Sequence, residues 1–531
     1  MSRPALLLLG LFAALYTVTL GTWELTRISE CRSGVIIREM LEGHTLYPRT
    51  PDGYFLEKPP LYYGLCAALS WVLGVNEWSL RLVSVAMALG TLAVTWFLAR
   101  LYASERAATL SVAVLGSNVV FLGWARMAMV DMTLTFFITA GLTAFFAARA
   151  GRLRPLRASI LCGFAFGLAV LSKGPIGIAL PLAVILGLLL METRGRPWKA
   201  RLPWKELGLA AALAVGIPAL WYVPGLLREG REFLETTILS ENFYMPLGKA
   251  RGLGVGHEQP FHYYFGRQLV AMLPMAVFLP DVLRWTWKRR GDAGTRALLG
   301  WFGLGFLLFM AASNKRFYYL LPLQPAVSVL VALALERRME EPGSRLTACC
   351  TRGVAVLLGC ASLAAFLFAA APQLADSRVP SDLLALLSDQ RPRIVLVAGL
   401  ALGAAALLFR TNRRPAEIGR TAILFALLAV MTRVWVQDPQ EARKNQSRAF
   451  VAEMKSKLPP GVTPVVVPPI FAYAVDFYWP ERLARRPSTG PDCRWAFVGA
   501  DLLNRLEGRH EVLGALKDKW EDRTVLLVRR E

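Results

Sequence analysis

The sequence predicts an α-helical polytopic membrane protein, with about thirteen transmembrane helices and a small C-terminal α/β domain outside the membrane. Of its 531 residues, 55% are hydrophobic and only 18% are charged. Mean hydropathy is +0.42. This balance leaves too little polar surface to cover a water-soluble protein of this size. The apolar residues also gather in runs long enough to cross a bilayer, and the charges lie between these runs.

The predicted transmembrane domain covers residues 1–437. Its expected spans lie near residues 5–22, 79–102, 106–124, 128–149, 157–172, 175–192, 206–226, 268–286, 296–313, 317–336, 353–372, 394–410 and 421–437. The first has a weak positive flank, Arg3, and no small-residue cleavage site follows it, so we expect an uncleaved span. Pro60–Leu73 is apolar but short, so we expect it to be re-entrant or to pack against the bundle.

Basic residues indicate the orientation of these spans. The formal net charge is +22, and many of the cations lie in alternate short loops. The loop clusters are Arg149, Arg152, Arg154 and Arg157; Arg194, Arg196, Lys199, Arg201 and Lys205; Lys288, Arg289 and Arg290; Arg337 and Arg338; and Arg410, Arg413, Arg414 and Arg420. This positive-inside pattern places the N-terminus inside, and it explains the charge without nucleic acid as a partner.

Three longer segments are expected on the outer side: loops 21–78 and 227–266, and a soluble domain over 438–531. In the first loop, apolar positions of Ser33–Leu41 predict a helix that lies along the membrane surface. In the soluble domain we expect an α/β fold. Its predicted strands are Val462–Val467, Trp495–Val498 and Val525–Val528, and its predicted helices are Arg448–Leu458 and Leu502–Leu506.

Ionisable residues accumulate at the outer ends of the spans. The stretches are Ser29–Arg32, Glu57–Pro60, Arg126 with Asp131, Lys173–Pro175, His257–Tyr264 and Lys315–Tyr319. Because charge near hydrocarbon is costly, polar residues at such positions are candidates for function. All of these stretches meet at one membrane face in the predicted topology, which is a stronger signal than any single motif.

The motifs resemble the bacterial polyprenyl-phosphate-sugar transferases, a family that includes the aminoarabinose transferase of lipid A and the protein O-mannosyltransferases. The resemblance is carried by Arg32 with Ile37–Leu41, Glu57–Tyr63, Arg126 with Asp131–Phe137, and Lys173–Pro175. It covers the helical region to about Leu335 and, more loosely, the soluble tail. It implies the membrane-embedded glycosyltransferase fold and a lipid-linked sugar donor.

The resemblance also implies roles for individual residues. Arg32, Lys58, Arg126, Lys173, Tyr318 and Tyr319 are expected to bind the donor phosphate. Glu57 and His257 are expected ligands of a divalent metal, either zinc or magnesium or manganese. Asp131 matches the second of the two carboxylates in the family pattern. At the first, in the first outer loop, this sequence has Ser29-Glu30 where the family usually has Asp-Glu. We therefore expect Glu30 to act as the first-loop carboxylate, or the activity to be altered or lost.

Each of these residues also has a simpler interpretation. Asp131 at a helix start is compatible with a capping role, and Arg32 and Lys58 with headgroup anchors. A single histidine such as His257 is more often a packed residue than a metal ligand. In the simpler interpretation of Glu30, its carboxylate only balances the charge of Arg32.

The expected function is transfer of a sugar from polyprenyl phosphate to an acceptor, most simply lipid A, at the periplasmic face of a bacterial inner membrane. A protein or glycan acceptor is the nearest alternative. A lipid-linked sugar transporter or flippase is the alternative from another class, and it predicts mid-span charges and paired broken helices. The predicted spans are nearly free of charge at mid-span, with Arg433 near an outer end, which favours the enzyme.

Overall fold

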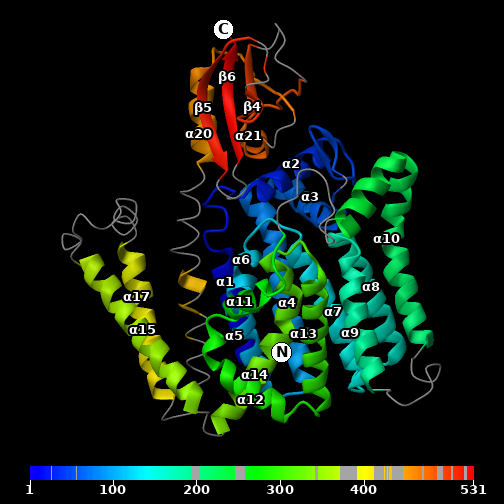
Figure 1. Cartoon of the computed structure of the whole chain (residues 1–531), viewed down its shortest axis with the longest axis vertical. Helices are drawn as coiled ribbons and strands as arrows, with labels where there is room; N and C mark the ends of the chain where they lie inside the picture. The colour runs from blue at the N-terminus through cyan, green and yellow to red at the C-terminus, as the bar shows by residue number, and fades with distance from the viewer. Residues whose placement is uncertain are drawn as a thin grey trace.

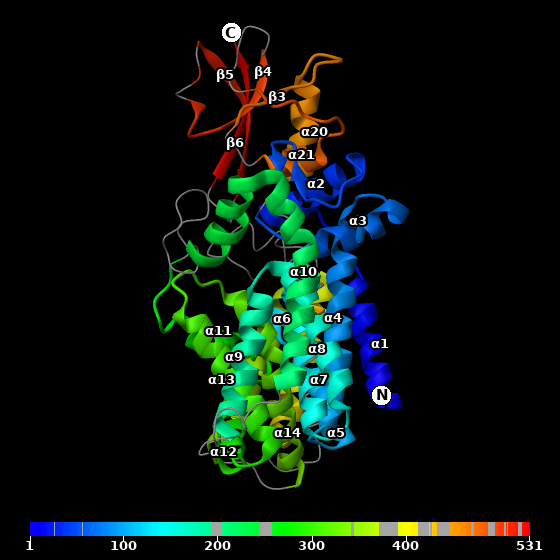
Figure 2. The same cartoon turned by 90° about the vertical axis from the view of Figure 1, so that its right-hand side faces the viewer.

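The computed structural model describes a helical bundle with a small sheet domain at one end (Figure 1). The described residues are 1–25, 27–55, 57–192, 204–244, 258–340, 345–370, 391–411, parts of 424–432, 446–468, 472–486, 494–503, 506, 508–518 and 523–530. In Figure 2 the N-terminus lies toward the end of the bundle away from the sheet domain. The predicted class, a polytopic helical protein with a small C-terminal α/β domain, is confirmed.

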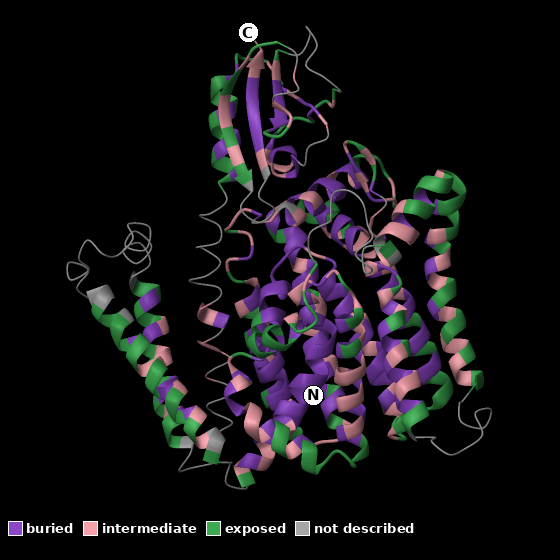
Figure 3. Cartoon of the chain, viewed as in Figure 1, coloured by how far each residue is buried: buried purple, intermediate pink, exposed green. Residues whose placement is uncertain are grey.

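The bundle is built from apolar helices of different lengths. They include α1 (Arg3–Thr17), α4 (Glu77–Arg100), α7 (Asp131–Arg149), α8 (Pro155–Lys173), α9 (Ile176–Glu192), α10 (Trp204–Phe233), α13 (Ala293–Ala311) and α14 (Gln324–Glu340). Within the described residues, seven helices are long and apolar enough to cross a membrane, or up to nine if each of two bent pairs is one span. Other apolar helices, among them α1 and α9, are shorter. Figure 3 shows buried residues concentrated in the middle of the bundle.

Two of the predicted spans are broken rather than continuous. Residues 106–124 form α5 (Glu105–Ser117) and α6 (Val119–Ala125), which meet at 68°. Asn118 lies between them, and its side chain accepts a hydrogen bond from the Phe121 amide, an N-cap contact that competes with a continuous helix.

The second break lies in the predicted span 268–286. Here α11 (Tyr263–Ala271) meets the helical segment Met275–Lys288 at 104°. The segment consists of η3 (Met275–Phe278) and α12 (Leu279–Lys288). Pro274 precedes it, and proline lacks the amide that a continuing helix needs.

Two helices that follow the bundle pair mainly with each other. They are α15 (Arg345–Ala370) and α17 (Arg391–Thr411), and Figure 1 shows them beside the main bundle. Exposed leucines such as Leu357, Leu367 and Leu402 lie along them, as expected for helices surrounded by lipid. Most of the predicted last span, 421–437, lies outside the described residues.

The first outer loop folds into a compact unit. It contains α2 (Ile28–Glu42), a hairpin of β1 (Arg49–Thr50) and β2 (Gly53–Tyr54), and α3 (Leu61–Leu73). The helix predicted over Ser33–Leu41 is confirmed as part of α2, but its apolar side does not lie on a membrane surface. Val35, Ile36 and Ile37 are fully buried in a cluster with the aromatic residues of this loop. The short segment after Pro60 packs against α2 and α4, the second of its two predicted arrangements.

The C-terminal domain is a four-stranded sheet with two helices. The strands are β3 (Val465–Val466), β4 (Trp495–Gly499), β5 (His510–Asp518) and β6 (Arg523–Arg530), and the helices are α20 (Ser447–Lys457) and α21 (Tyr473–Tyr478). The sheet order is β3-β4-β6-β5, with β3 parallel to β4 and the other pairs antiparallel. The predicted strands and the helix near Arg448–Leu458 are confirmed, whereas β5 and α21 were not predicted.

Candidate functional site

An ion pair joins α7 and α8 at the end of the bundle that contacts the loop of residues 21–78. Asp131 is the first residue of α7 and Lys173 is the last residue of α8. Because α7 and α8 are consecutive, antiparallel neighbours, the start of one lies beside the end of the other. The Lys173 ammonium contacts Asp131 Oδ1, and both side chains are mostly buried. The two residues predicted at separate motifs therefore form one site.

Aromatic rings enclose the same lysine. Its Nζ lies 5.1 Å from the ring centroid of Tyr318 and 4.6 Å from that of Tyr319. Both tyrosines come from η4 (Phe317–Leu323), a 3₁₀ helix that leads into α14. The Tyr318 ring also stacks on Trp124 of α6, with centroids 4.8 Å apart. Cation–π attraction to the two tyrosine rings holds the Lys173 ammonium in place. The ammonium keeps its positive charge and can still attract an anion.

Asp131 keeps one carboxylate oxygen without a hydrogen bond. Among the described residues, Oδ2 is buried and finds no hydrogen-bond partner, while Oδ1 meets Lys173. An unsatisfied buried oxygen is costly, so it is a natural acceptor for a ligand group or a proton. The N-cap position of α7 is Val130, and the Asp131 carboxylate in the first turn bonds to Lys173 rather than to a backbone amide of its helix. The simple capping interpretation therefore explains less of its environment.

A second group of charged residues lies on the first outer loop. Arg32 Nη1 contacts Glu57 Oε2 at 3.3 Å, and its guanidinium lies 4.9 Å from the ring centroid of Phe55. Lys58 follows directly and is half-buried. This group combines two cations with one carboxylate on the loop that the sequence indicated.

Tyr63 of α3 shares an apolar cluster with Phe55, which lies beneath Arg32, and with Val130, which precedes Asp131. Burial raises the pKa of Tyr63, and the charges of Arg32, Glu57 and Asp131 all act on it. Its ring also contacts Phe55 edge to face at 6.2 Å. Tyr63 is within the Glu57–Tyr63 motif, but no sequence pattern distinguishes it from the adjacent Tyr62. The structure thereby brings Arg32, Glu57, Lys173 and Asp131 to one region.

The structure corrects the expected placement of Glu30. Positions two apart on a helix point to different sides, so α2 does not present Glu30 and Arg32 to one cleft. Glu30 is fully buried, with Arg81 Nε 3.0 Å from Oε1 and Nη2 3.3 Å from Oε2. The Ala128 amide also donates to Oε1 at 2.9 Å. Glu30 therefore ties α2 to α4 and to the segment that precedes Asp131.

Arg81 was not singled out by the sequence reasoning. It also donates to the backbone oxygens of Leu20 and Trp23, each at 2.9 Å, and of Glu24 at 3.0 Å. An arginine in the first turn of an apolar span is a detectable signal, because such a charge needs a buried partner. The partner itself, Glu30, is 51 residues away in sequence.

Arg126 also differs from its expected role as a phosphate ligand. It is 6% exposed, and its guanidinium donates to carbonyls at the C-terminal end of α1. The contacts are Leu15 O at 3.3 Å, Val18 O at 3.1 Å, Tyr16 O, and Thr19 Oγ1 at 3.1 Å. A cation at a helix C-terminus satisfies carbonyls that have no helical partner. These contacts favour a structural role for Arg126.

The expected metal ligands are not assembled in the part of the chain that the structure describes. His257 lies outside the described residues. The described residues contain no group of three His, Cys, Asp or Glu side chains that could hold a metal ion. The Glu57 carboxylate contacts Arg32, and this ion pair would compete with a metal ion for the same carboxylate. The metal stays a prediction, and no chemical step below depends on it.

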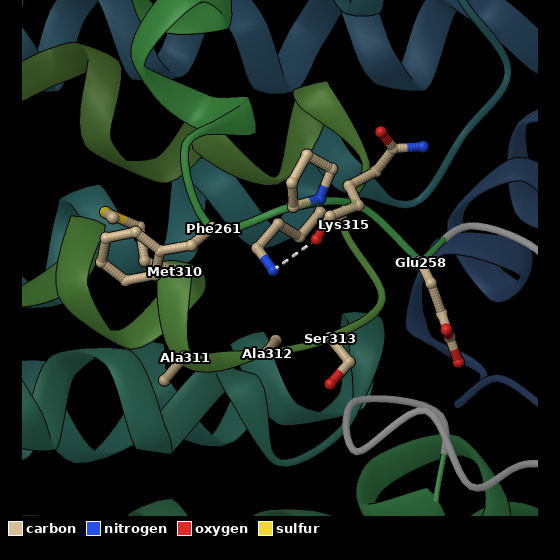
Figure 4. A pocket seen from close by; sticks show the side chains of 9 residues that line it. Glu258, Phe261, Met310, Ala311, Ala312, Ser313 and Lys315 are labelled. Atoms are coloured by element: carbon tan, nitrogen blue, oxygen red, sulfur yellow. Dashed lines mark hydrogen bonds between the residues drawn. The ribbon is translucent and has the colours of Figure 1, made fainter.

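A cavity of about 430 Å³ lies between the segment that precedes α11 and the C-terminal end of α13 (Figure 4). It is lined by Glu258, Gln259, Pro260, Phe261, Met310, Ala311, Ala312, Ser313 and Lys315. Lys315 Nζ donates to the Gln259 carbonyl at 3.1 Å. The sequence indicated both Glu258 and Lys315 as outer ionisable residues, and the structure places them on one cavity.

Comparisons with known sequences agree with the motifs. Residues 57–222 match the family described as dolichyl-phosphate-mannose-protein mannosyltransferase. The undecaprenyl phosphate-alpha-4-amino-4-deoxy-L-arabinose arabinosyl transferase of Enterobacter sp. (strain 638) is 30% identical over 333 residues, which are 61% of this chain and 58% of that protein. The protein of the same description from Edwardsiella ictaluri (strain 93-146) is 27% identical over 368 residues, 68% and 64% of the two chains. The matched region therefore spans about three fifths of these curated relatives.

Solved structures share the fold over a longer stretch. The crystal structure of ArnT from Cupriavidus metallidurans bound to undecaprenyl phosphate has a TM-score of 0.75 at 19% identity, covering 98% of this chain and 97% of that one. The apo oligosaccharyltransferase of Archaeoglobus fulgidus has a TM-score of 0.51 at 14% identity, covering 91% and 64%. The predicted resemblance to the polyprenyl-phosphate-sugar glycosyltransferases is therefore confirmed, and the chain has the fold of the membrane-embedded glycosyltransferases.

Proposed function

We propose that this protein transfers a sugar from a polyprenyl phosphate donor, undecaprenyl phosphate in bacteria, to an acceptor at the outer face of the membrane. The observation that carries the proposal is the Asp131–Lys173 pair, with its unsatisfied carboxylate oxygen, near the cations of the first outer loop. The names of the matched relatives, which describe transfer of 4-amino-4-deoxy-L-arabinose, support an amino sugar as the donor group.

The proposed reaction is a displacement at the anomeric carbon of the sugar. An acceptor oxygen forms the new bond to this carbon, and the bond to the phosphate oxygen breaks. The polyprenyl phosphate leaves with the electron pair, and Arg32, Lys58 and Lys173 stabilise the departing anion. Charge-assisted contacts in a site with little water are well suited to this task.

The proposed role of Asp131 depends on the acceptor. A hydroxyl acceptor must lose its proton, and Asp131 Oδ2 is placed to receive it. A phosphate of lipid A is already ionised and needs little base strength, so the carboxylate would mainly orient it. We propose lipid A as the acceptor, with a protein or another glycan as the nearest alternative.

We further propose that the protein resides in the bacterial inner membrane with this site facing the periplasm. The basic residues in alternate loops support this orientation, because such loops remain on the cytoplasmic side. The first outer loop and the C-terminal domain would then both lie in the periplasm.

The transporter alternative predicted paired broken helices, and the two bent spans match that expectation. Asn118 at one break and Gln268 near the other carry uncharged amides, and both hydrogen-bond to Gln324 at the start of α14. Ion-coupled transport uses ionisable groups at this depth. The site chemistry therefore favours the enzyme.

Mass spectrometry of lipid A and envelope glycans from wild-type and deletion cells tests this function. We expect one lipid A species to lose a sugar-sized mass in the deletion strain and to regain it on complementation. Unchanged lipid A with an altered glycan or glycoprotein would redirect the proposal to the alternative acceptor. Unchanged envelopes with lipid-linked sugar retained on the inner leaflet would support the flippase.

Donor binding gives a second test in purified protein. Arg32→Ala and Lys58→Ala each remove a cation, and we expect each to weaken the affinity for undecaprenyl phosphate by about tenfold or more. Arg152→Ala, in a short loop at the opposite end of the bundle, serves as the control. Unchanged affinity in both variants would refute phosphate binding at the first outer loop.

A further inference from the structure

The C-terminal domain rests on the first outer loop, with α21 packed against α2 (Figure 1). Phe477 lies so close to Gly34 that a Cβ at this glycine would be 2.4 Å from the phenylalanine ring. Tyr473, also from α21, is buried within the apolar cluster of the loop that contains Val35, Phe55 and Tyr63. The domain therefore contributes side chains to the core of the loop rather than only touching it.

Ion pairs bind the two parts together around this core. Arg482 Nη2 lies 2.8 Å from Glu39 Oε2, and Arg38 Nη2 donates to the Asp476 carbonyl at 2.8 Å. At the other edge, Arg448 contacts Glu77 and its amide donates to Glu24 at 3.0 Å. These contacts come from both ends of the domain and fix its orientation on the loop.

Arg485 is the centre of this interface. Its Nη1 and Nη2 donate to the two carboxylate oxygens of Asp476 at 2.8 and 2.7 Å, a bidentate arrangement. Its Nε donates to Asp52 Oδ1 at 2.9 Å. Its backbone is also paired with Val466 of β3. A guanidinium held in this way is already oriented for Asp52, so little side-chain freedom is lost when the pair forms.

Asp52 lies at the turn of the β1–β2 hairpin, whose strands pair Thr50 with Gly53. The chain that leaves this turn carries Phe55 beneath Arg32, then Glu57 and Lys58. Tyr473 shares the apolar cluster of Phe55, the ring beneath Arg32. Burial raises the pKa of Tyr473 to about 12, and the charges of Arg32 and Glu57 act on it as well. The domain thus reaches the charged group from two directions, through Asp52 and through Tyr473.

We infer that the C-terminal domain positions the donor phosphate site, with Arg485 anchoring the hairpin through Asp52 and Tyr473 packing in the apolar cluster that contains Phe55, the ring beneath Arg32. Arg485 and Tyr473 are positioning residues in this scheme. The inference rests on the proposed function, because the ligand of the positioned site is the polyprenyl phosphate.

The sharpest test is Asp52→Asn in the full-length protein. The Asp52 side chain is 40% exposed, so its change leaves the buried Arg485–Asp476 pair and the apolar core intact. We expect the affinity for undecaprenyl phosphate to fall by about three- to tenfold. This effect is modest because Asp52 does not contact the phosphate and acts only through the position of the hairpin. The donor KM should rise by a similar factor with little change in kcat, and Asp52→Glu should restore binding.

Glu481→Gln is the matched control, because Glu481 pairs with Lys455 on the surface of the same domain and not with the loop. Hydrogen exchange of residues 49–58 provides an independent measurement, and we expect faster exchange in Asp52→Asn but not in Glu481→Gln. Equal affinity and equal exchange in Asp52→Asn and wild type would overturn the inference. If wild-type protein fails to bind undecaprenyl phosphate, the proposed function is wrong, while the exchange measurement still decides whether Arg485 holds the hairpin.

Discussion

At the scale of single residues, the two carboxylates expected to act in catalysis have opposite environments. Asp131 keeps a buried oxygen without a hydrogen bond among the described residues, whereas both oxygens of Glu30 are engaged by Arg81. A group that takes part in a reaction must be able to meet its substrate. Asp131 meets this requirement, and Glu30 has the contacts of a structural residue.

For Asp131→Asn we expect kcat to fall by about a hundredfold with a hydroxyl acceptor, the usual scale for loss of a positioned base, and by less with a phosphate acceptor, which the carboxylate would only orient. The donor KM should change little, because the proposed phosphate ligands are cations. Turnover with saturating donor measures this effect. Asp292→Asn is the control, since Asp292 is exposed and pairs with Arg289 in a surface turn. Wild-type turnover in Asp131→Asn would remove Asp131 from the mechanism.

For Glu30→Ala we expect a large loss of stability, on the order of 3–5 kcal/mol, because it leaves the buried Arg81 charge without its partner. Thermal unfolding of purified protein measures the change as a lower Tm. The double variant Glu30→Leu with Arg81→Met should recover much of the loss, because it removes both charges. If Glu30→Gln unfolds like wild type but has lost turnover, Glu30 is catalytic and the structural assignment is wrong.

At the scale of elements, the two broken spans are held together by a buried amide network. Asn118 Nδ2 donates to Gln324 Oε1 at 3.0 Å, and Gln324 Nε2 donates to Gln268 Oε1 at 3.0 Å. The Val119 amide also donates to the Leu273 carbonyl at 3.3 Å, from one break to the other. Backbone groups freed by a break within a membrane need such internal partners. The network also fixes the start of α14, which follows the tyrosines of η4.

Gln324→Leu should therefore destabilise the bundle by about 1–3 kcal/mol, because it leaves Asn118 and Gln268 without this partner. We expect a lower Tm and weaker donor binding through displaced Tyr318 and Tyr319. The control is Gln446→Leu, since Gln446 is exposed before α20 and makes no capping contact. An unchanged Tm would show that the network contributes little.

At the scale of the whole molecule, the site depends on elements from distant parts of the chain meeting at one end of the bundle. The first outer loop, the ends of α7 and α8, η4 and the C-terminal domain all contribute. Charge patterning predicts that this end faces outward. The arrangement in the membrane can be tested without any activity assay.

A reporter fused after Arg413 should report the cytoplasm, and one fused after Pro439 should report the outside. Both fusion points lie outside the described residues, so the expectation rests on the basic loops alone. Two fusions on the same side would contradict the odd number of spans. A reversed pair would place the C-terminal domain inside and exclude a periplasmic site.

The sequence by itself determined the membrane class, the position of most helices and the family resemblance. These follow from local properties: the length of apolar runs, the sign of loop charges and short motifs such as Glu57–Pro60. It also indicated Asp131 and Lys173 separately. Both lie at helix ends, and ends of consecutive antiparallel helices must meet.

Only the tertiary structure decided which charge meets which. Glu30 and Arg81 are 51 residues apart, and Asp52 and Arg485 are 433 apart, so no local pattern relates them. A charged side chain in an apolar or half-buried place takes whichever partner the packing brings within reach. For this reason Glu30 and Arg126 contact the framework around Asp131, and the chemical roles expected of them from the sequence stay predictions.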